Sequence, residues 1–179
     1  MERINHLEYY ELDKFTKRWL CKRGGRVLDG VFDKFIARYI VIASIANALK
    51  RADDRMEGGH DKQYCTEKIA ELFNGSEEMI TCKLNRHAKE LGKVISDRPF
   101  SVISSRGYNP DLHGKWGDET ECKGEWLKSL LETLYYLRCN LFHGHKEFEP
   151  YQQELLSPAN NCLRIIIKEA MNALKPDLQ

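Results

Sequence analysis

The stretch VFDKFIARYIVIASIANAL, residues 31–49, decides the fold of this chain. Its apolar side chains recur at helical spacing and cover more than one face of the predicted helix. Asp29 precedes the stretch as a suitable N-cap residue, and we expect the helix to run to about Arg55. A helix that is apolar nearly all round is buried on several sides. It therefore lies either at the centre of a helical bundle or across a subunit interface.

Helical periodicity continues on both sides of this stretch. The other predicted helices span residues 1–22, 62–74, 76–95, 125–142 and 157–174. Ser76 is the expected N-cap of one of them, and Ser157 caps the last, with Pro158 at its first helical position. Glycines and prolines interrupt the pattern between residues 97 and 123, where we expect a long loop. The sequence therefore predicts a single all-α domain over residues 1–179, a bundle of about five to six helices.

Composition narrows the classes of protein without indicating an activity. The chain has 179 residues, of which 42% are apolar, and 28 Lys and Arg against 27 Asp and Glu give a net charge of +1. That balance argues against a protein that is basic over its whole surface. The most apolar stretch, residues 39–49, is much shorter than the ~20 residues of a membrane span. The charged opening residues do not resemble a signal peptide, so we expect a cytoplasmic protein.

The six cysteines are widely and irregularly spaced. They are Cys21, Cys65, Cys82, Cys122, Cys139 and Cys162. No Cys-x2-Cys pair is present, so the spacing predicts neither a zinc site nor any other metal or cofactor. We expect free thiols, most of them packed as small hydrophobic side chains.

The segment LYYLRCNLFHGHKE, residues 134–147, contains the residues best suited to catalysis. Arg138 lies on the edge of the apolar stripe of its helix, and His143 comes five residues later, directly before Gly144. Five helical steps place the two side chains roughly 140° apart around the helix axis. They can converge if the helix unwinds at His143, or if a second copy of the helix supplies the partner.

An arginine and a histidine together can cleave RNA without a metal. Histidine titrates near neutral pH and moves protons in either direction. Arginine presents a charged fork that matches phosphate oxygens. Such a pair can promote attack of a ribose 2′-hydroxyl on the adjacent phosphate, which limits the chemistry to RNA. The spacing alone is weak evidence for a catalytic pair. The more common interpretation is that the arginine forms an ion pair and that the histidine lies at a helix C-terminus, where it interacts favourably with the helix dipole.

The string RCNLFHG, residues 138–144, resembles the motif of the HEPN (higher eukaryotes and prokaryotes nucleotide-binding) family. The resemblance extends over residues 125–174 and, more weakly, to the helix at 31–49; the loop at 97–123 has no counterpart and reads as an insert. It implies a metal-independent endoribonuclease, often a toxin or antiviral defence effector. It also implies a homodimer whose composite site holds Arg138 and His143 of both chains, with Asn140 as a positioning group. A nucleotidyltransferase-type antitoxin is the implied partner.

One position departs from that motif. Cys139 follows Arg138 where the family usually has a polar residue. A thiol is a poor hydrogen-bonding group, so the departure puts catalysis in doubt. The alternatives are a non-catalytic HEPN module that dimerises or binds a nucleotidyltransferase, and a helical adaptor with no role in nucleic-acid chemistry.

A basic stretch near the N-terminus is the best candidate for contact with an RNA backbone. Its cations, with no acidic residue between them, are Lys14, Lys17, Arg18, Lys22, Arg23 and Arg26. A solvated helix face is the ordinary interpretation of such a run. His145 is a further candidate RNA contact, and Tyr135 and Tyr136 either stack on a base or, as is more common, pack in the core.

Overall fold

The computed structural model describes residues 4–20, 30–52, 61–97, 123–142 and 150–176, and these ranges are helical with short turns and no strand. The helices are α1 (His6–Leu20), α2 (Val31–Ala52), α3 (Asp61–Gln63), α4 (Ile69–Glu71), α5 (Glu77–Asp97), α7 (Lys123–Phe142) and α8 (Pro150–Leu174). A π-helix, η1 (Tyr64–Lys68), joins α3 directly to α4. The prediction of an all-α bundle is confirmed.

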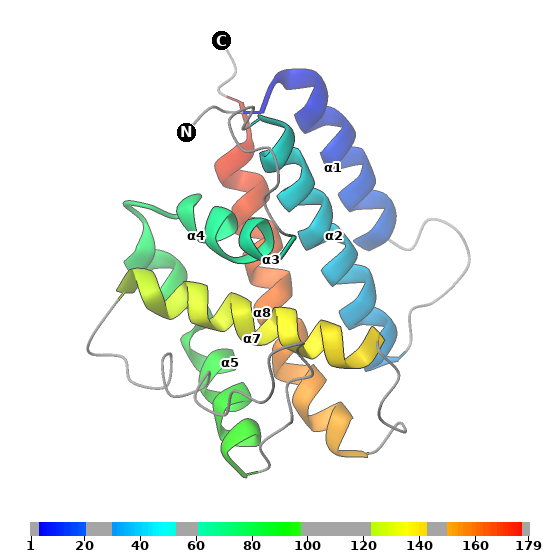
Figure 1. The fold of residues 1–179 in the computed structure, drawn as a ribbon, viewed down its shortest axis with the longest axis vertical. Helices are drawn as coiled ribbons and strands as arrows, with labels where there is room; N and C mark the ends of the chain where they lie inside the picture. Colours follow the sequence, from blue (N-terminus) through cyan, green and yellow to red (C-terminus); the bar gives the residue numbers. More distant parts are fainter. Residues whose placement is uncertain (1–3, 21–29, 53–60, 98–122, 143–149, 177–179) are drawn as a thin grey trace.

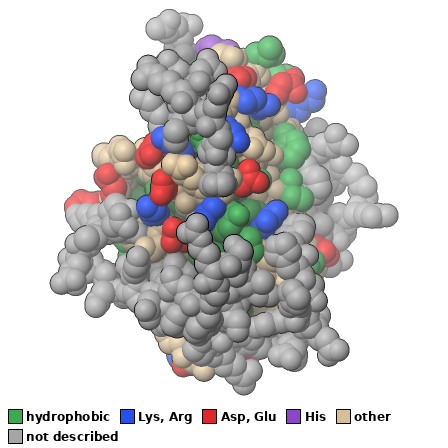
Figure 2. Space-filling view, viewed as in Figure 1, with side chains coloured by type: hydrophobic (Ala, Val, Ile, Leu, Met, Phe, Trp, Pro, Cys, Tyr) green, Lys and Arg blue, Asp and Glu red, His purple; other side chains and the backbone are tan. Residues whose placement is uncertain are grey.

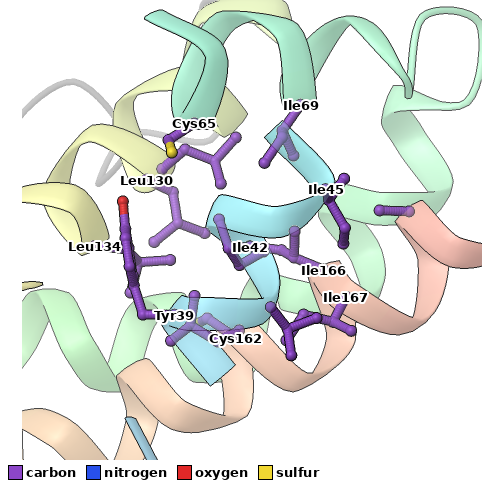
Figure 3. Packing of buried hydrophobic residues seen from close by; sticks show 14 of the residues in the cluster. Tyr39, Ile42, Ile45, Cys65, Ile69, Leu130, Leu134, Cys162, Ile166 and Ile167 are labelled. Carbon is purple, nitrogen blue, oxygen red and sulfur yellow. The ribbon is translucent and has the colours of Figure 1, made fainter. Parts of the chain in front are cut away.

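The centre of the bundle is formed by α2 and α8. Helix α1 runs antiparallel to α2 and packs on it, α5 packs on α8, and α7 lies across the bundle against η1, α4 and α5 (Figure 1). Buried side chains of α2 therefore meet neighbours on several sides (Figure 3). Of the two places open to this helix, the centre of a bundle is the one observed. Phe32, Ile36 and Ile40 of α2 are only partly buried within the single chain.

A hydrogen-bonded network fixes the start of α2 to the middle of α8. The Arg38 guanidinium donates through Nη1 to the Asn160 side-chain oxygen at 2.8 Å and to the Asn160 carbonyl oxygen at 3.2 Å. The Asn160 amide nitrogen in turn donates to the Val31 carbonyl oxygen at 2.7 Å. Asn160 is only 4% exposed, so these bonds satisfy polar groups that would otherwise be costly to bury.

The predicted start of the last helix is wrong. Helix α8 begins at Pro150, and Ser157 and Pro158 lie inside it instead of capping it. A proline inside a helix lacks one backbone donor and costs about 3 kcal/mol. Leu155, Leu156 and Ala159 around it are buried, so the apolar stripe of α8 continues through the proline. Tertiary packing of this stripe outweighs the local preference of the Ser-Pro pair.

The turn before α5 is formed largely as expected. Gly75 adopts a φ of 84°, a backbone conformation that residues with a Cβ rarely adopt. Ser76 precedes the helix, and its carbonyl oxygen accepts from the Ile80 amide at 3.2 Å. Its hydroxyl, however, donates to the Phe73 carbonyl oxygen at 3.1 Å, so it stabilises the turn and not the first amides of the helix.

Other predicted boundaries agree with the helices within a few residues. The predicted N-cap residue Asp29 and residues 98–122 of the expected loop lie outside the described residues. Within the described ranges, no helix has an apolar stretch long enough to cross a membrane. The described cysteines are free thiols; Cys65, Cys139 and Cys162 are buried, whereas Cys82 is exposed.

Candidate functional site

Arg138 lies near the C-terminal end of α7, where this helix passes over the N-terminal half of α2 (Figure 1). The helix is regular through Phe142, so Arg138 and Asn140 both project from ordinary helical positions. Both side chains are partly buried. His143 and His145 lie outside the described residues. The described part of the site is therefore its arginine half.

The Arg138 guanidinium lies over the ring of Tyr39, with its central carbon 5.9 Å from the ring centroid. A cation over an aromatic face is stabilised by about 0.5–2 kcal/mol, more as water is excluded. On α7 itself, Nη1 lies 3.9 Å from the sulfur of Cys139, which is only a weak acceptor. Cys139 is 8% exposed, so the residue that departs from the motif points into the protein.

Tyr39 is enclosed by its neighbours. It is 5% exposed, its ring stacks on Phe35 with centroids 6.1 Å apart, and the Cys65 thiol of η1 lies near its hydroxyl. Figure 3 shows the ring beside Leu134 of α7, with Cys65 approaching from η1. Burial raises the pKa of Tyr39 well above its usual range, and the neighbouring Cys65 thiol adds to the shift. Burial likewise raises the pKa of Cys65 to about 11.

Tyr135 completes the surroundings of Arg138. Partial burial raises the pKa of its phenol, and its proximity to Cys139 raises this pKa further. Tyr39, Cys65 and Tyr135 are therefore all neutral at pH 7. The arginine cluster, defined as Tyr39, Cys65, Tyr135, Arg138 and Cys139, places a guanidinium beside two phenols and two thiols.

The neighbouring Tyr136 has a structural role. Its hydroxyl accepts a hydrogen bond from Lys62 Nζ at 3.0 Å, and the same ammonium lies 4.9 Å from the ring centroid and 3.2 Å from a Glu132 carboxylate oxygen. Burial opposes the charge on Lys62, but these two partners outweigh it and raise the pKa of the ammonium. The contacts tie α3 to α7. Tyr135 and Tyr136 also pack against the core, as the more common of the two interpretations expects.

The π-helix η1 explains how Cys65 reaches the arginine cluster. A π-turn widens the helix, and such turns are common at functional sites. Tyr64, Cys65 and Thr66 are three consecutive buried residues in η1. The Thr66 hydroxyl donates to the Lys62 carbonyl oxygen at 2.8 Å, one turn earlier, and so satisfies a backbone acceptor within this segment.

The structure describes only part of the basic stretch. Lys14 and Lys17 are exposed on α1, and Lys17 forms an ion pair with Asp13 at 2.6 Å. The side chain of Arg18 and all of Lys22, Arg23 and Arg26 lie outside the described residues. Because α1 is antiparallel to α2, the end of α1 that bears Lys14 and Lys17 lies beside the half of α2 that bears Tyr39 (Figure 1). Lys14 and Lys17 of the basic stretch and the arginine cluster thus adjoin the same half of α2.

The described surface visible in Figure 2 is mixed in charge, with Lys and Arg side chains interspersed with Asp and Glu. An open pocket toward the other end of α7 is lined by the carboxylates of Glu67, Glu71 and Glu77, with Lys128 pairing with Glu67 at 2.8 Å. Those carboxylates repel phosphate, so this pocket is a poor place for RNA. Among the described residues, no three His, Cys, Asp or Glu side chains lie close enough to hold a metal ion.

Sequence reasoning missed Tyr39 and Cys65 as parts of the site. Both lie far from Arg138 in the sequence and sit on different helices. Their apolar neighbours make each look like an ordinary core residue, so no local signal distinguishes them. Comparison of the chain with models of protein families, with curated proteins and with solved structures finds no match.

Proposed function

We propose that this protein is a metal-independent endoribonuclease whose site combines Arg138, His143 and Asn140 from two copies of the chain. The observation that carries the proposal is the arginine cluster at the end of α7, on the helix that leads directly into His143. The resemblance of residues 138–144 to the HEPN motif supports it independently of the contacts.

The cluster suits a phosphate for electrostatic reasons. Tyr39, Cys65 and Tyr135 are neutral at pH 7 and therefore do not compete with a bound anion for the guanidinium charge. Partial burial of Arg138 strengthens its attraction for a phosphate relative to a fully hydrated cation. The planar guanidinium can then contact two phosphate oxygens at once.

The proposed reaction is an internal transesterification. The ribose 2′-oxygen loses its proton, forms a bond to phosphorus and displaces the 5′-oxygen of the next nucleotide, which takes up a proton. The products are a 2′,3′-cyclic phosphate and a 5′-hydroxyl, and no metal is needed for this balance. His143 transfers the protons, Arg138 stabilises the charge that develops on the phosphate oxygens, and Asn140 positions the phosphate.

A second copy of the chain is part of the proposal. Arg138 projects from a regular helix that continues through Phe142, so ideal geometry directs Arg138 and His143 to different faces. A two-fold dimer brings the arginine of one chain to the histidine of the other. The basic stretch around Lys14 and Lys17 lies beside the same half of α2 and would extend the site along the RNA backbone. A role as a toxin or defence effector, with a nucleotidyltransferase antitoxin, follows from the resemblance alone.

The test is cleavage of a short unstructured RNA in EDTA, with the matching DNA as substrate control. We expect 2′,3′-cyclic phosphate ends, a loss of about 10²–10⁴-fold for His143→Ala and about 10²–10³-fold for Arg138→Ala. Arg86→Ala and His87→Ala are matched controls, because both lie on α5 and pair with Glu90 at 3.1 and 3.2 Å. Equal losses in these controls, or cleavage of DNA, would contradict the proposal.

Mixed dimers test the second copy directly. Arg138→Ala and His143→Ala chains are each inactive alone, but a mixed dimer retains one arginine and one histidine across the two-fold axis. We therefore expect partial recovery of cleavage when the two variants are refolded together. No recovery in a confirmed mixed dimer would place both residues of each site on one chain.

A second function is favoured by one observation, the burial of Cys139. At this position the chain offers a thiol that contacts Arg138, not a polar group that faces a substrate. A non-catalytic module that dimerises or binds a nucleotidyltransferase-type partner would tolerate a cysteine in place of the polar residue of the motif. Intact RNA in the EDTA assay, with wild-type protein that is folded and dimeric, would establish this alternative over the nuclease.

A further inference from the structure

We infer that Tyr39 is a positioning residue, which orients the Arg138 guanidinium toward the phosphate that the arginine is proposed to bind. The inference rests on the proposed function for its substrate, but the contact from which it is drawn is part of the fold. Tyr39 comes from α2 and Arg138 from α7, so the contact joins two helices that are far apart in the sequence.

An arginine side chain has several rotatable bonds, and a site that acts on phosphate needs its fork held in one direction. The neighbour on its own helix provides little constraint, because the Cys139 sulfur at 3.9 Å is a weak acceptor. The Tyr39 ring provides a flat surface at 5.9 Å over which the planar guanidinium can lie. The ring is therefore the stronger of these two constraints on the direction of the fork.

Tyr39 is itself well immobilised, as an orienting group must be. Stacking on Phe35 fixes one side of the ring, and the Cys65 thiol lies near its hydroxyl end. Its 5% exposure leaves no room for rotation into solvent. Cys65 belongs to η1, so the widened turn of this π-helix is part of the support. The chain of contacts thus runs from η1 through Tyr39 to Arg138.

This arrangement makes a prediction that separates the ring from the hydroxyl. Tyr39→Phe keeps the ring beneath the guanidinium and removes only the hydroxyl, so cleavage should stay within about threefold of wild type. Tyr39→Leu removes the ring and should lower kcat by about 10–100-fold with a much smaller change in KM, because orientation matters most in the transition state. Phe73→Leu, an equivalent change at a residue that is 1% exposed elsewhere in the core, is the matched control.

A second readout does not depend on RNA. Nitrogen-15 relaxation of the Arg138 Nε–Hε group, assigned by its loss in Arg138→Lys, reports how rigidly the guanidinium is held. We expect a high order parameter in wild type, Tyr39→Phe and Phe73→Leu, and a value below about 0.6 in Tyr39→Leu. Tyr39→Met repeats the experiment with a flexible side chain if the leucine variant fails to fold.

The two readouts keep the outcomes distinct. A mobile guanidinium in Tyr39→Leu with a reduced kcat, both restored in Tyr39→Phe, supports the inference. If the guanidinium becomes mobile in Tyr39→Leu but the wild-type protein does not cleave RNA, the orienting contact is supported and only the nuclease proposal is refuted. An unchanged order parameter, or unchanged kcat despite a mobile guanidinium, would overturn the positioning role.

Discussion

Two arginines of this bundle, Arg38 and Arg138, are both partly buried, yet their surroundings differ in kind. Arg38 of α2 donates to two oxygens of Asn160, and the Asn160 amide donates in turn to the Val31 carbonyl, which also belongs to α2. Arg138 of α7 lies over the ring of Tyr39, with one guanidinium nitrogen 3.9 Å from the sulfur of Cys139. The guanidinium of Arg38 holds two helices together through oxygen acceptors, whereas that of Arg138 rests on an aromatic ring.

The comparison shows how one side-chain type serves two purposes. Hydrogen bonds to oxygen satisfy a buried arginine and stabilise the fold. An aromatic surface fixes the plane of a guanidinium while leaving its N–H donors able to reach an anion. Burial lowers the pKa of Arg38, and Arg164 nearby lowers it further. That cost of burying charge is what the bonds to Asn160 offset.

The largest expected effect comes from replacing each arginine by lysine, which keeps the positive charge and removes the planar guanidinium group. Arg138→Lys should lower RNA cleavage by about 10²-fold with little change in melting temperature, because the lost interaction is with the transition state. Arg38→Lys should leave the cleavage rate of the folded protein within about threefold and lower the melting temperature. Steady-state kinetics and thermal unfolding of both variants measure this, and an exchange of the two results would refute the comparison.

The second effect is the loss of the hydrogen-bonded network of Arg38, Asn160 and Val31. Asn160→Ala removes the side-chain acceptor of Arg38, which keeps only the backbone carbonyl of residue 160, and removes the donor to Val31, so two partly buried polar groups each lose a partner. We expect the free energy of unfolding to fall by about 2–4 kcal/mol, as measured by urea titration. Asn161→Ala, the neighbouring and partly exposed residue, is the matched control. A loss below about 1 kcal/mol would show that the network contributes little to stability.

The third effect concerns alkaline pH. The pKa of Cys65 is raised from 9.0 to about 11, so the folded protein keeps a proton that the unfolded chain releases. The stabilisation is complete below pH 9 and is lost as the pH rises from about 9 to about 11, a total of about 2–3 kcal/mol. Cys65→Ala should flatten this part of the stability profile, measured by urea unfolding at each pH.

Exposed Cys82 is the control for that profile, because the wild-type slope should persist in Cys82→Ala. A profile for Cys65→Ala that falls as steeply as wild type would remove Cys65 as the cause. The shifted phenols of Tyr39 and Tyr135 would then account for the alkaline loss, because their pKa values are raised in the same direction.

The smallest effect tests an unsatisfied polar group in η1, the element that also contains Cys65 of the arginine cluster. The Tyr64 hydroxyl of η1 is buried and has no hydrogen-bond partner within the described structure, in contrast to the satisfied groups around Arg38. Tyr64→Phe should stabilise the protein by about 1 kcal/mol, because it removes a polar group that burial disfavours. The ring, over which Lys50 lies at 5.6 Å, is kept. Destabilisation of similar size in thermal unfolding would show that the hydroxyl does have a partner.

Much of the fold could be predicted because helices are local. Apolar spacing in residues 31–49 predicted a helix buried on several sides, and α2 is that helix. The start of α8 could not be predicted, because Ser157 and Pro158 form a good helix start in isolation. Only the neighbouring helices, which bury the stripe on both sides of Pro158, reverse that preference.

The candidate site divides in the same way. The sequence by itself determined the helical class and the choice of Arg138, because both depend on residue type and on spacing over a few turns. The tertiary structure alone decided that Tyr39 and Cys65 surround this arginine and that Asn160 partners Arg38 instead. The physical reason is that helical periodicity is a property of neighbours along the chain, whereas the surroundings of a charge depend on which helices pack together.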